Sequence, residues 1–137
     1  SIKASIIHRL DVLAKACQVQ IRDREAVLCR TLGVLEKIHL INDHLFGKEE
    51  FRGNNEDYYN YRNSLLDYVL ESKKGIPITL AILYSCICRR LNISVHLVGL
   101  PGHAVLGFMA ERGSTHQEDG HIPQVYYLDV FHQGTLL

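Results

Sequence analysis

Lys74-Gly75-Ile76-Pro77-Ile78-Thr79-Leu80-Ala81-Ile82-Leu83-Tyr84 is the stretch that decides the fold, because it predicts the start of an apolar helix. Proline is tolerated at the first helical position, where its missing N–H would be unpaired in any case, and Gly75 lets the chain turn into the helix. Patterns before this stretch are helical, and patterns after it are those of strands. Helices followed by a hairpin-rich sheet predict an α+β domain.

We expect the central helix to end near Leu91 and Asn92. After it, the repeat of apolar residues changes from 3.6 residues, as in a helix, to 2 residues, as in a strand. This period predicts a strand over residues 94–100 and an antiparallel partner over residues 103–109, joined by a tight turn at Pro101 and Gly102. A polar loop follows over residues 111–123, and residues 124–131 are expected to form a third strand.

Two helical patterns occupy residues 1–47 and predict an antiparallel helix pair, because the connection between them is short. Asp23 is the expected N-cap between the helices, and Gly47 is expected to close the second one. Residues 48–63 are polar, rich in Asn and Asp, and interleaved with aromatics. They are either a loop with Asx turns or the border of a cleft. Helical spacing resumes over residues 64–72.

The composition is that of an ordinary globular domain, with 137 residues, 47% apolar, 22% charged, and 15 basic against 15 acidic side chains. We expect one domain over residues 1–137. The absence of a basic surplus argues against nucleic acid as the main partner, and no apolar run is long enough to span a membrane. The start without Met, together with the apolar ending, suggests a piece of a longer chain. The four cysteines lie in apolar helical patterns and predict reduced core residues rather than a metal site.

An ordered string of motifs resembles the transglutaminase-like family of bacterial SirB-type proteins, and the same module is similar to the central region of an F-box protein. The resemblance covers about residues 45–137, which divides the chain into a helical lead-in over residues 1–47 and a transglutaminase-like core over residues 48–137. The motifs are Gly53-Asn54, Tyr58-Tyr59, Asn63-Ser64-Leu65, Val69-Leu70-Glu71, Gly75-Ile76-Pro77-Ile78, Leu83-Tyr84, Arg89-Arg90-Leu91, Val98-Gly99-Leu100-Pro101-Gly102-His103 and Leu128-Asp129.

The resemblance implies a papain-like core with a central helix packed on an antiparallel sheet, and a triad of Cys at a helix start, His on the next strand and Asp on the strand after it. In this chain Pro77 occupies the nucleophile position, while His103 and Asp129 match the other two positions. Cys86 lies roughly 13 Å along the helix from Pro77, at about 1.5 Å per residue, and cannot replace the missing thiol. We therefore expect no transglutaminase or protease activity. The two remaining triad residues are either structural or a retained dyad that binds a ligand or activates water.

A second constellation consists of His116, His121 and His132 with Asp129 nearby in sequence. Its spacing matches no standard metal-binding pattern, so we expect neither a metal ion nor another cofactor.

The resemblance implies a non-catalytic protein-interaction module, within an F-box substrate-recognition subunit of a cullin-type ubiquitin ligase. The implied partners are a Skp-type adaptor and a cullin, bound through the parent chain, and a ubiquitination substrate, in the cytoplasm or nucleus. One alternative is a residual hydrolase, in which His103 and Asp129 activate water in a cleft bounded by the loop of residues 54–63. Another is a stand-alone regulatory protein of bacterial type. The candidate binding residues are Asn54, Tyr58, Tyr59, Asn63, His103 and Asp129.

Overall fold

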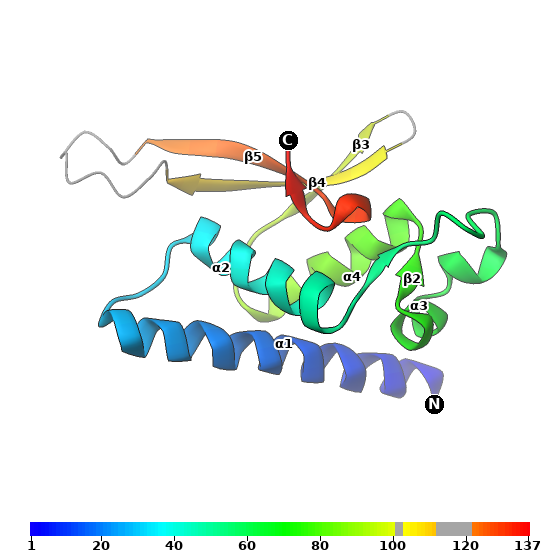
Figure 1. Ribbon diagram of the computed structural model, residues 1–137, viewed down its shortest axis with the longest axis horizontal. Helices are drawn as coiled ribbons and strands as arrows, with labels where there is room; N and C mark the ends of the chain where they lie inside the picture. The colour runs from blue at the N-terminus through cyan, green and yellow to red at the C-terminus, as the bar shows by residue number, and fades with distance from the viewer. Residues whose placement is uncertain (101–102, 112–121) are drawn as a thin grey trace.

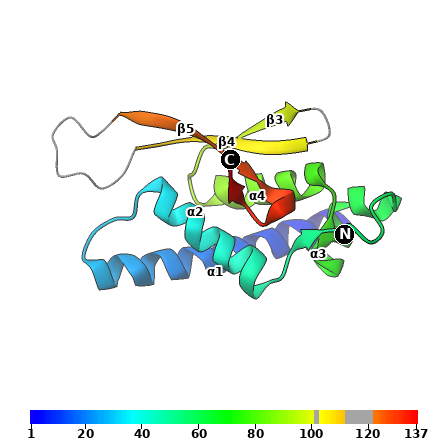
Figure 2. The ribbon, with the colours of Figure 1, turned by 45° about the horizontal axis from the view of Figure 1, so that its top comes forward.

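The computed structural model describes residues 1–100, 103–111 and 122–137, and it has the α+β architecture that the sequence predicts. Figures 1 and 2 show a layer of helices on one side of an antiparallel sheet, with the opposite face of the sheet left uncovered by helices. The turn predicted at Pro101 and Gly102, and most of the predicted polar loop, lie outside the described residues.

The first two helices, α1 (Ile2–Leu28) and α2 (Val34–Asn42), form the predicted antiparallel pair (Figure 1). The predicted break at Asp23 is wrong, because α1 continues through this residue. Neither Gly nor Pro interrupts the chain there, and an exposed Asp costs little within a helix of good helix formers. The helix ends instead at Cys29, whose φ of 56° is left-handed. Gly33 is the N-cap of α2, and its N–H donates to Glu36 Oε1 at 3.1 Å.

The second helical segment extends past the predicted Gly47 by one residue, and its last turn is a π-helix, η1 (Asp43–Lys48). A short parallel strand pair follows, made of β1 (Arg52–Gly53) and β2 (Lys74–Gly75). Between these strands lie a 3-10 turn, η2 (Tyr61–Ser64), and the helix α3 (Leu66–Ser72). The strand pair was not predicted, because two residues are too few for a period to be recognised.

The central helix α4 (Pro77–Arg90) begins at Pro77 and ends before Leu91, as the sequence predicts. It packs against α1, β4 and the turn η3. The sheet has the order β3 (His96–Leu100), β4 (His103–Glu111), β5 (Pro123–Asp129) and β6 (Thr135–Leu136), and η3 (Val130–His132) precedes the last strand. Strand β6 was not predicted, since it too has only two residues. In the register of the sheet, Leu106 lies opposite Leu97 on one side and Leu128 on the other.

One hydrophobic core joins the first helix pair, α4 and the inner face of the sheet. Cys17 and Cys88 are buried in it, and burial raises the pKa of each thiol to about 12. Cys29 is exposed at the end of α1, contrary to the expected core position, because the helix ends there. Among the described residues, no helix has the length and apolar character needed to cross a membrane. The fully buried members of the core include Cys17, Ile38, Ala81, Ile87, Leu106 and Leu128.

Candidate functional site at the start of helix α4

The first turn of α4 is where the superfamily resemblance places a nucleophile. Pro77 is the first helical residue and is half-buried, and Ile76 precedes it as the N-cap. The hydroxyl of Thr79 accepts a hydrogen bond from the Ile76 N–H at 3.2 Å. The same hydroxyl donates to the backbone oxygen of Asn63 at 2.6 Å, which ties the helix start to the preceding loop. The Thr79 hydroxyl therefore links residue 76, at the helix start, to residue 63.

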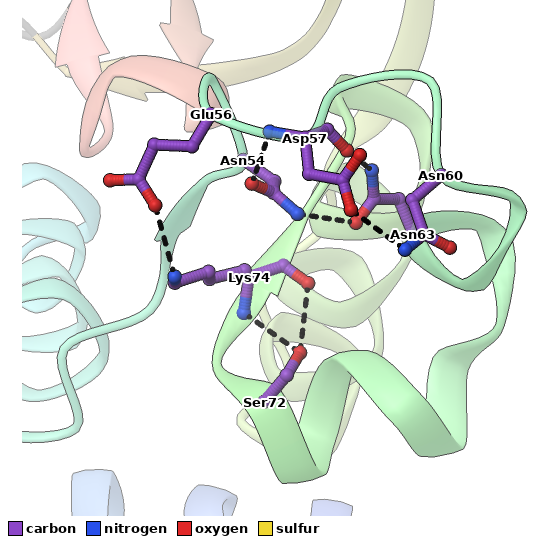
Figure 3. Close-up of polar contacts among 7 residues, drawn as sticks. All are labelled: Asn54, Glu56, Asp57, Asn60, Asn63, Ser72 and Lys74. Carbon is purple, nitrogen blue, oxygen red and sulfur yellow. Dashed lines mark hydrogen bonds and ion pairs between the residues drawn. The ribbon is translucent and has the colours of Figure 1, made fainter.

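The loop over residues 54–63 is held by a buried amide network, which Figure 3 shows. Asn54 Nδ2 donates to Asn63 Oδ1 at 2.9 Å, and Asn54 Oδ1 accepts from the Asp57 N–H at 3.1 Å. Asn63 Nδ2 donates to the backbone oxygens of Asp57 and Tyr58, at 2.8 and 2.9 Å. Both amides are buried, so the loop has the Asx-turn character predicted for it. Both protons and the oxygen of the Asn63 side chain are used inside the protein.

Tyr58 and Tyr59 of this loop are both exposed. Tyr59 is 95% exposed, and the Tyr58 ring packs edge-on against Phe131, with the ring centres 5.9 Å apart. A Cβ at Gly53 would lie 2.6 Å from the Phe131 ring, so the end of β1 closely approaches the turn η3. The loop and η3 therefore form adjoining parts of one surface beside the start of α4.

The side chains of Asp129 and His132 form a hydrogen-bonded pair at the turn η3. His132 Nδ1 lies 2.8 Å from Asp129 Oδ2, and because a carboxylate only accepts, the imidazole donates through Nδ1. Asp129 Oδ1 accepts from the Phe131 N–H at 3.1 Å. The Asp129 side chain is largely buried, whereas the His132 side chain is 61% exposed. The buried carboxylate thus orients an accessible imidazole.

The structure does not bring His103 to Asp129 through a hydrogen bond. His103 begins β4 opposite Leu100, its side chain is exposed, and it makes no hydrogen bond or ion pair within the described part of the chain. Sequence reasoning weighed His132 only as a metal ligand and missed it as the partner of Asp129. The sequence signal was the Asp-x-x-His spacing, because a 3-10 turn places side chains three residues apart on the same side of the turn.

The constellation of His116, His121, His132 and Asp129, at which no metal ion was expected, is only partly covered by the described residues. His116 and His121 lie outside the described residues. Within residues 1–100, 103–111 and 122–137, no group of three His, Cys, Asp or Glu side chains is placed to hold a metal ion.

Beside the start of α4, the described residues provide a candidate base, His132, but no thiol at position 77. His132, held by Asp129, has the arrangement of the base and orienting residue in hydrolytic triads. Its Nε2 makes no hydrogen bond to the residues that the structure describes and could accept a proton there. Pro77 offers no nucleophilic atom at the helix start. The chemistry that these groups could support is therefore proton transfer to or from a bound molecule or water.

Comparison with known proteins places the chain in a wider context. A family model described as the transglutaminase-like superfamily matches residues 4–137, so the match includes the first helix pair and extends beyond the predicted residues 45–137. The chain is similar to a UPF0162 protein of Xylella fastidiosa, at 38% identity over 77 residues, covering 56% of this chain and 27% of that protein.

It is also similar to F-box only protein 21. The Mus musculus protein is 34% identical over 98 residues, covering 71% of this chain and 15% of that protein. The Homo sapiens protein is 28% identical over 152 residues, covering 93% of this chain and 24% of that protein. The chain thus spans only 15–27% of the length of these relatives. No solved structure matches it. The resemblance recognised from the sequence motifs is confirmed.

Proposed function

This chain belongs to the transglutaminase-like superfamily, and we propose that it is a non-catalytic protein-interaction module of that superfamily. The observation that carries the proposal is Pro77 at the first position of α4. In the triad that the resemblance implies, a thiolate stands there, where the free N–H groups and the helix dipole stabilise it. The ring of proline has no atom that can attack a carbonyl.

The other nucleophile candidates support the same proposal. Cys88 is buried within α4, and burial raises its pKa to about 12, so its thiolate is not formed near neutral pH. The Thr79 hydroxyl is buried and donates to Asn63. Cys86 is roughly 13 Å farther along the helix than Pro77, at about 1.5 Å per residue.

We further propose that residues 1–137 act as one domain of a substrate-recognition subunit of a cullin-type ubiquitin ligase. The similarity to F-box only protein 21 and the single hydrophobic core support this context. The Skp-type adaptor and the cullin would bind through the parent chain, in the cytoplasm or nucleus. The substrate would contact Tyr58, Tyr59, His103 and the Asp129 region, while Asn54 and Asn63 hold the loop that presents the tyrosines.

Affinity capture with the full-length protein that contains this chain tests the ligase context. We expect the wild type to recover a Skp-type adaptor and a cullin. Tyr59→Ser and Asp129→Ala should lose candidate substrates while retaining both ligase components. Tyr127→Ser, on the exposed outer face of the sheet, is the matched control. Absence of the adaptor and the cullin from every sample would overturn the ligase assignment and favour a stand-alone regulatory protein.

Alkylation of Pro77→Cys tests whether position 77 is the former nucleophile position. A thiol at the first helical position should react with iodoacetamide at pH 6 faster than the exposed thiol of Cys29, because the helix terminus favours the thiolate. Equal rates at the two cysteines would contradict the alignment of position 77 with the nucleophile.

The hydrogen bond between Asp129 and His132 favours a second candidate, a residual hydrolase that activates water. We expect the full-length protein to hydrolyse amide and ester substrates no faster than His132→Ala does. A rate in the wild type that falls by tenfold or more in both His132→Ala and Asp129→Asn would establish the hydrolase instead.

A further inference from the structure

We propose that Asn42 is a positioning residue, which fixes the turn of residues 129–135 and, through this turn, the orientation of the His132 imidazole. The inference rests on the proposed function, because the Asp129 region of the turn belongs to the surface proposed for substrate contact. Asn42 is the last residue of α2 and is distant from the turn in sequence. The turn packs beside α4, as Figures 1 and 2 show.

Hydrogen bonds within the turn of residues 129–135 close it. The Gly134 N–H donates to the backbone oxygen of Asp129 at 2.9 Å, and the Thr135 hydroxyl donates to the backbone oxygen of His132 at 2.6 Å. The His132 imidazole donates to the Asp129 carboxylate at 2.8 Å. Gly134 has a φ of 74°, in the left-handed region that glycine tolerates. The conformation of the turn therefore depends on where its closing residue, Gly134, lies.

The Asn42 side chain contacts Gly134 in two ways. Its Nδ2 donates to the Gly134 backbone oxygen at 3.1 Å. A Cβ at position 134 would lie 2.5 Å from Asn42 Oδ1 and 2.6 Å from its Cγ, so the amide packs directly against the glycine. The absence of a side chain at position 134 lets Asn42 reach the backbone of the turn.

Tyr84 of α4 holds the other side of the Asn42 amide. Because the Gly134 carbonyl only accepts, the amide directs its NH₂ group to the turn and its oxygen to Tyr84. The Tyr84 hydroxyl donates to Asn42 Oδ1 at 2.7 Å. Burial raises the pKa of Tyr84 well above its usual range, so the hydroxyl keeps its proton and remains a donor. The Tyr84 ring stacks on Phe46, with the ring centres 6.1 Å apart, so the protein core sets the direction of the amide.

The His132 imidazole follows the conformation of the turn. Its side chain is 61% exposed, and it bonds to Asp129 of the same turn. Loss of the Asn42 contact should let Gly134 move and weaken the bond that closes the turn. The imidazole would then lose, in part, the acceptor that keeps its proton on Nδ1.

Nitrogen-15 NMR of the histidine side chains tests the proposal, because it reports which ring nitrogen carries the proton. The 137-residue protein is labelled in its histidines and measured at about pH 8, where an ordinary imidazole is neutral. The signal missing from His132→Ala identifies His132. We expect the wild type to carry this proton on Nδ1, and the fraction protonated there to fall by about half or more in Asn42→Ala.

Tyr84→Phe keeps the ring and removes only the hydroxyl that directs the Asn42 amide. It should lower the fraction protonated at Nδ1 less than Asn42→Ala does, because Asn42 retains its donor to Gly134. If Asn42→Ala does not fold, this variant provides the test with the aromatic packing retained.

Ile21→Val is the matched control, since it removes a methyl group from the core at α1 and leaves these hydrogen bonds in place. It should reduce stability and leave the His132 tautomer as in the wild type. An unchanged tautomer in both Asn42→Ala and Tyr84→Phe would overturn the inference. An equal change in Ile21→Val would do so too, because lost stability alone would then explain it.

Substrate capture with the full-length protein is a separate readout. Asn42→Ala should lose the candidate substrates that Asp129→Ala loses, and it should retain the adaptor and the cullin. A changed tautomer in Asn42→Ala with all substrates retained would support the positioning role and remove the turn from the proposed substrate surface. Failure of the proposed function is thus distinguished from failure of this inference.

Discussion

The loop over residues 54–63 and the turn η3 both adjoin the start of α4 and both carry polar and aromatic side chains, but they use these side chains differently. In the loop, Asn63 is 0% exposed, and both its amide protons and its oxygen bind groups of the protein. In the turn, Asp129 is nearly buried while His132 projects into solvent. A buried polar group must be satisfied within the fold, whereas an exposed group keeps its capacity for a ligand.

This difference separates the residues that hold the site together from those that could act in it. Asn54, Asn63 and Thr79 fix the loop to the helix start, and their removal should cost stability. His132 and Tyr59 add little to the fold and are available to a partner. The measurements below test this division, from the largest expected effect to the smallest.

Replacement of Asn63 by alanine should cause the largest loss of stability. It removes three hydrogen bonds at a fully buried position, and we expect the free energy of unfolding to fall by roughly 3 kcal/mol. Urea denaturation measures the change. Asn55→Ala, at an exposed position of the same loop, is the control and should stay within about 0.5 kcal/mol of wild type. A loss below 1 kcal/mol for Asn63→Ala would show that the network contributes little.

Replacement of Thr79 by valine keeps the side-chain shape but removes its hydroxyl. The backbone oxygen of Asn63 and the N–H of Ile76 both lose a partner, so the free energy of unfolding should fall by about 1 to 2 kcal/mol. Thr79→Ser retains the hydroxyl and should recover at least half of this loss. A valine variant as stable as wild type would show that these two hydrogen bonds contribute little to the fold.

The buried His44 should make the stability of the protein depend on pH. Gln20 Nε2 donates to its Nδ1 at 2.9 Å, and its Nε2 lies 3.5 Å from Glu49 Oε1. Burial lowers the pKa of His44, with Lys48 and Lys73 acting in the same direction and Glu49 opposing them. The unfolded chain therefore takes up this proton first, and stability should fall as the pH drops below about 6.5.

The slope contributed by His44 is at most about 1.4 kcal/mol per pH unit, since one proton is involved. Urea denaturation between pH 5 and 7.5 measures it. His44→Gln should show a flatter dependence than wild type over this range. Identical slopes for the two proteins would mean that His44 does not titrate differently in the folded and unfolded states.

The exposed histidines should show the smallest effects on stability. His132→Ala breaks a pair with one exposed member, which corresponds to a loss of about 0 to 1 kcal/mol. His103→Ala removes an exposed side chain without a hydrogen-bond partner in the described residues and should change stability by no more than about 0.5 kcal/mol. Thermal denaturation compares the two variants with wild type. A loss above 2 kcal/mol in either would place that imidazole in the group of structural residues.

The order of the elements and the start of α4 could be predicted from the sequence because local signals specify them. Pro77 fixes the first helical position, and the change of period after residue 93 marks the sheet. The division between α1 and α2 was mispredicted at Asp23, because a favourable N-cap residue is also tolerated inside a long helix when nothing breaks it. The short strands β1, β2 and β6 lack a period of their own and exist through pairing with distant residues.

The sequence alone determined the family, the α+β architecture and the proline at the start of the central helix, because these depend on residue identity and local periodicity. Only the tertiary structure decided which polar side chains bind other groups of the protein, as the Asn63 amide does. It also decided that Asp129 pairs with His132. Burial and hydrogen-bond partners depend on how the chain packs.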